Sequence, residues 1–243
     1  MFWNLVRYEF KNVNKWYLAL YGAVLALSAL IGVQASSLKS IDTPDQQMIM
    51  LVFLALVFGG LIITLSISTL ILIIRRFKGS VYDRQGYLTL TLPVSEHQII
   101  LSKLLGAFIW SLASSLVFIL SIYIILVLTG ANFLDIFSLE YLFKFYMDSF
   151  WLSVISYILS TISGILCIYL AISIGQLFNE YRTALAVLAY IVIQIVLGFV
   201  GLNLRIDTNF NMMLTFEIFT DLILSAAFYL GAYYILKNKV NLQ

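Results

Sequence analysis

Long apolar runs alternate with short polar stretches along the whole chain. Six of these runs approach or exceed the length of about 20 residues that a helix needs to cross a bilayer. The pattern predicts an all-α integral membrane protein with six transmembrane helices. We expect spans at about residues 16–33, 48–74, 99–128, 151–177, 183–201 and 218–236.

Two short polar motifs predict where helices begin. The sequence TPDQ at residues 43–46 offers a Thr cap, Pro at the first helical position and Gln at the third. The sequence SEHQ at residues 95–98 has the spacing of a capping box. We therefore expect the second span to be preceded by a helix start near Pro44. The helix of the third span should start in water and enter the bilayer near Lys103.

The first residues have a different pattern, because apolar and polar side chains alternate at helical spacing over residues 2–14. Such a helix is too polar to span, but it can lie in the membrane interface with its aromatic side down. We expect an amphipathic interfacial helix here, with a cytosolic leader as the alternative. One side would carry Trp3, Val6, Phe10 and Val13, and the other Asn4, Arg7, Lys11 and Asn14.

The distribution of basic residues predicts the orientation, since short cytosolic loops are enriched in Lys and Arg. With both termini in the cytosol, eleven of the fourteen basic residues lie inside and three lie outside. The three outside residues would be Lys39, Lys144 and Arg205. The eleven inside residues would be Arg7, Lys11, Lys15, Arg75, Arg76, Lys78, Arg84, Lys103, Arg182, Lys237 and Lys239.

Composition supports the membrane assignment, because 62% of the residues are apolar and 11% are charged, whereas soluble domains carry about 25% charged residues. A soluble fold of this composition would have no polar surface. We expect one transmembrane domain over residues 1–243. The single cysteine, Cys167, lies inside an apolar run and excludes an intramolecular disulfide; we expect a small buried hydrophobe there.

Catalytic motifs are absent from the sequence. There is no GxxxxGK[ST] loop, no HExxH motif and no GxSxG elbow. The one histidine, His97, stands beside Glu96 without a second metal ligand nearby in sequence, and the spans hold no histidine base. We therefore expect no enzyme active site, no metal site, no bound cofactor and no nucleic-acid partner.

Polar residues inside the spans give a possible substrate path, formed by Ser156, Ser160, Gln194, Glu217 and Asp221. Serines recur along the fourth span, and small residues of this kind also let membrane helices pack closely. A lone amide such as Gln194 most often bonds to a neighbouring helix. Glu217 and Asp221, near the outer end of the sixth span, could meet a cationic substrate. Alternatively, they could line a solvated vestibule or pair with Arg205.

The long polar interruption over residues 75–103 separates the second and third spans. It holds five of the fourteen basic residues, the one histidine and one of the two prolines. Both charge signs occur beside aromatic and apolar side chains, which is typical of protein interfaces. Gly79 and Gly86 mark possible ends of a short helix. A solvated loop that sets only the topology is the alternative.

This interruption contains the sequence GYLTLTLPVS at residues 86–95, followed by LSKLL at residues 101–105. The two strings resemble a motif of small bacterial ABC transporter permeases of the type-2 (exporter) class. Length, six-span layout and interfacial helix fit the same class. Where such permeases often have a basic residue after the Ser, this chain has Glu96.

The resemblance implies a partner that supplies the energy. Two permease chains, identical or homologous, would sit with two copies of a separate ATP-binding subunit that holds ATP and Mg²⁺. A cytosolic coupling helix between spans two and three, at about residues 75–85, would dock on that subunit. The coupling residues would be Arg75, Arg76, Phe77, Lys78, Val81, Tyr82, Asp83 and Arg84.

The expected location is the bacterial cytoplasmic membrane, as a multi-pass protein among its lipids. The expected function is ATP-driven export of an amphipathic or apolar substrate such as a peptide, toxin or antibiotic. Two alternatives stay open: a self-contained channel or secondary carrier, and a membrane anchor or sensor that recruits a soluble partner.

Overall fold

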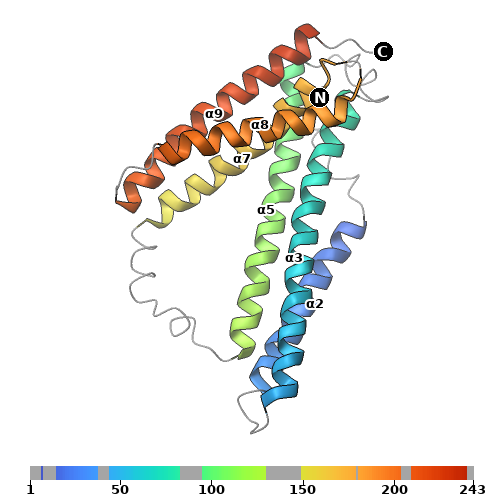
Figure 1. Cartoon of the computed structure of the whole chain (residues 1–243), viewed down its shortest axis with the longest axis vertical. Coiled ribbons are helices and arrows are strands. Elements are labelled where there is room, and N and C mark those ends of the chain that lie inside the picture. The colour runs from blue at the N-terminus through green and yellow to red at the C-terminus, as the bar shows by residue number, and fades with distance from the viewer. Residues whose placement is uncertain are drawn as a thin grey trace. The chain divides into compact units, whose positions relative to one another are not determined.

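The computed structural model describes residues 7, 15–37, 44–82, 95–129, 149–178, 180–203 and 209–239, and these form six long helices (Figure 1). No strand occurs among these residues. The helices are α2 (Lys15–Ser37), α3 (Pro44–Val81), α5 (Glu96–Thr129), α7 (Phe150–Gly175), α8 (Arg182–Asn203) and α9 (Phe210–Lys239).

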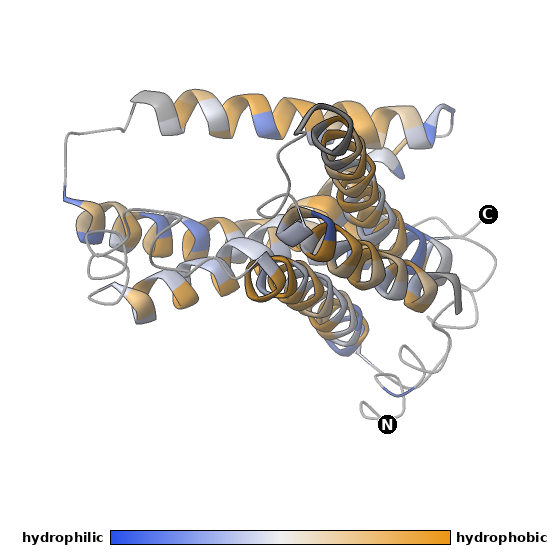
Figure 2. Cartoon of the chain, turned by 90° about the horizontal axis from the view of Figure 1, so that it is seen from below, coloured by the Kyte–Doolittle hydropathy of each residue, from blue (hydrophilic) through white to orange (hydrophobic). Residues whose placement is uncertain are grey.

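All six helices are long and apolar enough to cross a membrane. Hydrophobic residues run along each of them in Figure 2. The prediction of an all-helical, multi-pass membrane protein is therefore confirmed at this level. The predicted interfacial helix at residues 2–14 lies outside the described residues, apart from Arg7.

Both predicted helix starts are confirmed. The helix α3 begins at Pro44 and α5 begins at Glu96. At the start of α5, the carbonyl of Ser95 accepts hydrogen bonds from the amides of Gln98 (2.9 Å) and Ile99 (3.2 Å). Pro at the first helical position and Ser just before the first turn are both favoured because the first amides of a helix have no partner within it.

Two helices, α9 and α3, extend furthest beyond the predicted spans. The helix α9 begins at Phe210, eight residues before the expected start of the sixth span, and the carbonyl of Asn209 accepts a bond of 3.0 Å from the amide of Met213. The helix α3 continues without interruption to Val81. Gly79 therefore lies inside a continuous helix, and residues 75–81 extend the second span rather than forming a separate helix.

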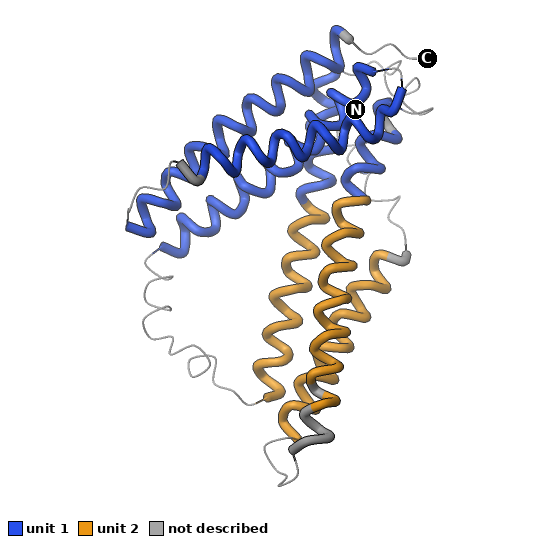
Figure 3. The backbone as a smooth tube through the Cα atoms, viewed as in Figure 1, with its two compact units in different colours: residues 1–11, 72–108, 149–243 blue, residues 12–71, 109–148 orange. Residues whose placement is uncertain are grey.

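The described helices pack as two compact units (Figure 3). Unit 1 contains the described residues of Met1–Lys11, Leu72–Phe108 and Ser149–Gln243, and unit 2 those of Asn12–Ile71 and Ile109–Asp148. The division falls inside α3 and α5, so the ends of these two helices that flank the polar interruption belong to unit 1.

Unit 2 has a small apolar core and a cluster of hydroxyl groups. Val24, Leu65 and Val117 bring α2, α3 and α5 together. The hydroxyl of Tyr17 lies 2.6 Å from that of Thr69 and 2.7 Å from that of Ser114. Because lipid offers no hydrogen bonds, such contacts hold membrane helices in a defined register.

Unit 1 is organised around α7, which packs against both α8 and α9. The helix α8 returns antiparallel after the turn at residues 176–181, and Gly175 permits the close approach. A Cβ atom at Gly175 would lie 2.5 Å from the carbonyl oxygen of Arg182 and 2.6 Å from the Cβ of Ala186. The turn itself requires a left-handed residue, which is Tyr181 with φ of 54°.

The helices α7 and α9 run parallel. Their contacts follow the same order along both segments. Ser149, the residue before α7, contacts Asn211, and Ser156 contacts Glu217. Further along, Ser163 lies near Asp221. Further along, Gly231 packs against Leu170. The buried core of unit 1 then joins these helices to the ends of α3 and α5 through residues such as Phe77, Ile100, Tyr169 and Phe228.

Candidate functional site

The C-terminal turns of α3 carry five of the eight predicted coupling residues. Arg75 is exposed, and Arg76 and Lys78 are half-buried. Phe77 and Val81, which we expected to be apolar anchors for a partner, are 1% and 0% exposed. The structure thus gives these two side chains a packing role within the chain. Asp83 and Arg84 lie outside the described residues.

Phe77 packs flat on a tyrosine of α7. Its ring lies 3.9 Å from the ring of Tyr169 with an interplanar angle of 8°, and 6.0 Å from the ring of Tyr82, nearly edge-on. Aromatic pairs at such distances add to the stability that burial alone provides. The end of α3 therefore packs against α7 through stacked aromatic rings.

Tyr82 adds a polar connection to the same helix. Its hydroxyl donates a hydrogen bond of 2.8 Å to Oγ of Ser173, and Ser173 donates one of 2.8 Å to the carbonyl of Tyr169. Burial raises the pKa of Tyr82 to about 12, although the bond with Ser173 lowers it in part. Tyr82 is therefore neutral at physiological pH and serves as a donor.

Lys78 connects α3 to the start of α8. Its Nζ donates a hydrogen bond of 3.0 Å to Oγ1 of Thr183. The adjacent turn exposes Leu177, Phe178 and Tyr181. The sequence pattern did not identify these side chains as a surface. The available signal was three large apolar residues placed between the polar residues of a turn.

The first turn of α5 is attached to α9 through the single histidine. Nδ1 of His97 lies 2.6 Å from the hydroxyl of Tyr229, and the imidazole stacks on Tyr233 with ring centres 3.9 Å apart and an angle of 18°. Nζ of Lys237 lies 5.6 Å from the centre of the same Tyr233 ring. Sequence reasoning had considered His97 only as a metal ligand.

A second polar region lies between α7 and α9, and we call it the α7–α9 polar seam. Oγ of Ser156 donates a hydrogen bond of 2.9 Å to Oε2 of Glu217, and the side chain of Ser163 lies near Asp221. At the start of both segments, Ser149 bonds to the side chain of Asn211. The seam consists of Ser149, Ser156, Ser163, Asn211, Glu217 and Asp221.

Glu217 and Asp221 lie further into their helix than the sequence indicated. They are seven and eleven residues beyond Phe210, which corresponds to about 10 and about 16 Å along the axis at 1.5 Å per residue. The earlier start of α9 is the reason. Both carboxylates thus belong to the body of the helix rather than to its first turn.

The structure brings together some predicted path residues and separates others. Ser156, Glu217 and Asp221 lie in the α7–α9 polar seam. Ser160, four residues after Ser156 on α7, is exposed. Gln194 donates from Nε2 to Sγ of Cys167 at 3.8 Å, so it bonds to a neighbouring helix as expected for a lone amide. Cys167 is buried, as expected.

Two buried hydroxyl groups in the same helices have no hydrogen-bond partner among the described residues. They are Oγ of Ser153 on α7 and Oγ of Ser225 on α9. Ser153 precedes Ser156 by one turn, and Ser225 follows Asp221 by one turn. Both helices therefore carry a buried hydroxyl group in addition to the residues of the α7–α9 polar seam.

Within the described part of the chain, no group of three or more His, Cys, Asp or Glu side chains is arranged to hold a metal ion. Comparison of the chain with protein-family models, curated proteins and solved structures finds no match.

Proposed function

We propose that this chain is the membrane-spanning permease subunit of an ATP-driven exporter of the type-2 ABC class. The observation that carries the proposal is the attachment of both ends of the polar interruption to helices α7–α9. At the α3 end the contacts are Phe77 with Tyr169, Tyr82 with Ser173 and Lys78 with Thr183. At the α5 end, His97 contacts Tyr229.

Such an arrangement suits a subunit that receives force from another protein. A segment that only set the topology would need no side-chain connections to three different helices. The sequences GYLTLTLPVS and LSKLL in and beside this segment add the resemblance to type-2 permeases. The proposed complex has two such permease chains, identical or homologous, and two ATP-binding subunits in the bacterial cytoplasmic membrane.

In this proposal ATP and Mg²⁺ are bound by the partner subunit, and this chain supplies no catalytic group. Its docking surface combines the exposed Arg75 with Lys78 and the apolar side chains of the α7–α8 turn. Interfaces commonly combine Arg and aromatic residues in this way. Asp83 and Arg84 complete the proposed surface from the sequence.

The proposed cargo is amphipathic or apolar, such as a peptide, toxin or antibiotic. A substrate that moves along α7 and α9 would pass the α7–α9 polar seam, where Glu217 is exposed in the described chain. A carboxylate within a membrane helix is costly unless it faces polar groups or water. Glu217 and Asp221 therefore favour cargo that carries a positive group.

The test is to recover the chain from its native membrane by an affinity tag and assay ATP hydrolysis. We expect an ATP-binding subunit to co-purify. Arg75→Glu should reduce the recovered ATPase activity because it reverses the charge of an exposed docking residue, whereas Gln98→Ala, also exposed, should not. Transport of cargo by the chain alone in liposomes, without nucleotide, would contradict the proposal.

A secondary carrier or channel is the second candidate, and the position of Glu217 and Asp221 inside α9 favours it. Carriers use intramembrane carboxylates to bind coupling ions. Ion-gradient-driven uptake into liposomes that contain only this chain would support this candidate. Loss of that uptake in Glu217→Gln would show that transport depends on the α7–α9 polar seam.

A further inference from the structure

The two ends of the polar interruption are attached to different helices of the same group. The α3 end contacts α7 and α8 through the three side-chain interactions described above. The α5 end contacts α9 through His97. Both attachments, and all three helices, belong to unit 1.

The His97 attachment combines two kinds of contact. The ring stacks on Tyr233, and the Nδ1 atom lies within hydrogen-bonding distance of the Tyr229 hydroxyl. Tyr229 and Tyr233 are four residues apart, so they occupy adjacent turns on one side of α9. A single side chain in the first turn of α5 therefore contacts two turns of α9.

We infer that His97 is a positioning residue that transmits movement of the polar interruption to α9. This inference rests on the proposed function. In the cycle, the ATP-binding subunits shift the segment, the α3 attachment moves α7 and α8, and the His97 attachment moves α9 with them. The three helices, two of which carry the α7–α9 polar seam, then respond together.

The alternative is that spans two and three tilt as a rigid pair and carry the movement alone. The packing argues for the inference, because residues 72–81 of α3 and 96–108 of α5 are in the same compact unit as α7–α9. Their buried side chains share one core with α7 and α9, including Phe77, Ile100, Tyr169 and Phe228. A force on these ends reaches helices α7, α8 and α9, which we call the α7–α9 group, through direct contacts.

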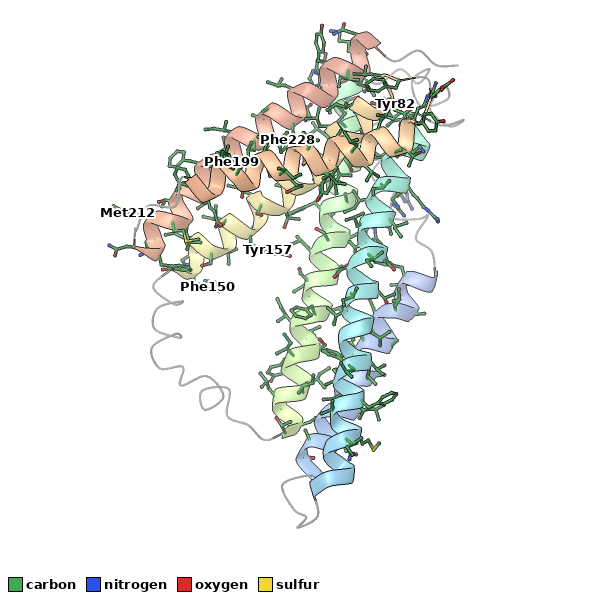
Figure 4. The ribbon with its side chains drawn as sticks, in the orientation of Figure 1. Tyr82, Phe150, Tyr157, Phe199, Met212 and Phe228 are labelled. Atoms are coloured by element: carbon green, nitrogen blue, oxygen red, sulfur yellow. The ribbon has the colours of Figure 1, made fainter. Side chains whose placement is uncertain are left out.

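The position of Met212 allows the movement to be measured without knowing the cargo. Met212 is 62% exposed. It lies at the end of the α7–α9 group opposite to Tyr82, together with Phe150 (Figure 4). A Met212→Cys variant in a Cys167→Ala background gives one thiol at that end. Its rate of reaction with a membrane-impermeant maleimide is compared with and without ATP and vanadate.

Matched variants separate the two contacts of His97. His97→Phe keeps a ring that can stack on Tyr233 but removes the bond to Tyr229. His97→Asn keeps a polar group near the position of Nδ1 but removes the ring. Tyr229→Phe removes the bond from the other side. Gln98→Ala and Tyr234→Phe alter exposed neighbours in the same two turns and serve as controls.

We expect nucleotide to change the labelling rate at Met212→Cys in the complex that contains native His97. In His97→Phe and Tyr229→Phe, that nucleotide-dependent difference should fall by about threefold or more, which is typical of residues that couple distant sites. ATP hydrolysis should continue in both. Combining the two substitutions should cause no further loss, and the control variants should behave as the parent.

The outcomes distinguish the inference from the proposed function. If no ATPase co-purifies and nucleotide has no effect in the parent, the proposed function fails. If nucleotide changes labelling in the parent and equally in all three His97 and Tyr229 variants, the inference fails while the proposed function stands. Intact folding is checked by thermal unfolding in detergent; should His97→Phe unfold, Tyr229→Phe decides the question.

Discussion

Ser156 of α7 donates a hydrogen bond of 2.9 Å to the carboxylate of Glu217 on α9. The pair joins two parallel helices within the α7–α9 polar seam. It therefore has two possible contributions: it holds the helices in register, and it keeps one oxygen of an intramembrane carboxylate satisfied.

The first contribution predicts a loss of stability in Ser156→Ala. Hydrogen bonds between membrane helices contribute about 0.6 kcal/mol on average and up to about 1.7. We expect a loss in this range for Ser156→Ala and almost none for Ser160→Ala, because Ser160 is exposed. Unfolding of the purified chain in detergent measures both. Equal losses in the two variants would contradict the assignment of Ser156 to the seam.

Gly175 predicts a steric effect. Its missing Cβ would collide with the backbone of Arg182 and the side chain of Ala186. Gly175→Ala should destabilise the chain by about 1–3 kcal/mol, the usual cost of overpacking. Gly164, on the same helix, has no atom within 4 Å of its Cβ position. Gly164→Ala should therefore be neutral or slightly stabilising, and thermal unfolding of the two variants tests the difference.

Substitution of Phe77 should reduce stability. A loss of ATPase recovery in a Phe77 variant would therefore not show that Phe77 contacts the partner. Its ring is 1% exposed and stacked on Tyr169, so Phe77→Ala should cost about 3–5 kcal/mol, as truncation of a buried aromatic residue does. Arg75→Ala should change stability by less than about 0.5 kcal/mol, since Arg75 is exposed. The measurement is detergent unfolding alongside ATPase recovery. Only the arginine variant should lose ATPase recovery at full stability.

Tyr82 predicts a dependence on alkaline pH. Burial raises its pKa to about 12, above the ordinary value near 10. The folded state therefore holds the phenol proton more tightly than the unfolded state. Its contribution to stability is fully present below about pH 10 and declines as the pH rises toward 12. The difference in unfolding free energy between the native chain and Tyr82→Phe should shrink over this interval.

The control for that experiment is Tyr234→Phe. Tyr234 is 59% exposed, so its substitution removes a phenol without removing a buried contact. A difference for Tyr82→Phe that stays constant with pH would contradict the assignment of its phenol to a buried bond with Ser173.

Much of the fold could be predicted because the bilayer makes hydrophobic length decisive. The starts at Pro44 and Glu96 were readable from local capping chemistry. The start of α9 was missed because Asn, Thr and Glu between residues 209 and 217 lower the hydropathy. An N-terminal Asn cap followed by Phe210, Met213 and Leu214 was the signal that helical periodicity, rather than hydropathy, could have detected.

The site was harder to predict, because pairing between distant helices leaves little trace in one sequence. Glu217 and Asp221 were identified from their charge, and their serine partners from small-residue spacing, but their register required the structure. Burial of Phe77 was missed because an aromatic residue among basic ones looks like an exposed anchor. The contact of His97 with α9 had no local signal at all.

The helices differ greatly in length. At 1.5 Å per residue, the 34 residues of α5 extend about 51 Å and the 22 residues of α8 about 33 Å, whereas the hydrocarbon layer is about 30 Å thick. The longer helix must lean or protrude where the shorter one can stand upright. Lipid acyl-chain length should therefore alter how this protein sits, and thick and thin membranes would favour different inclinations of α5.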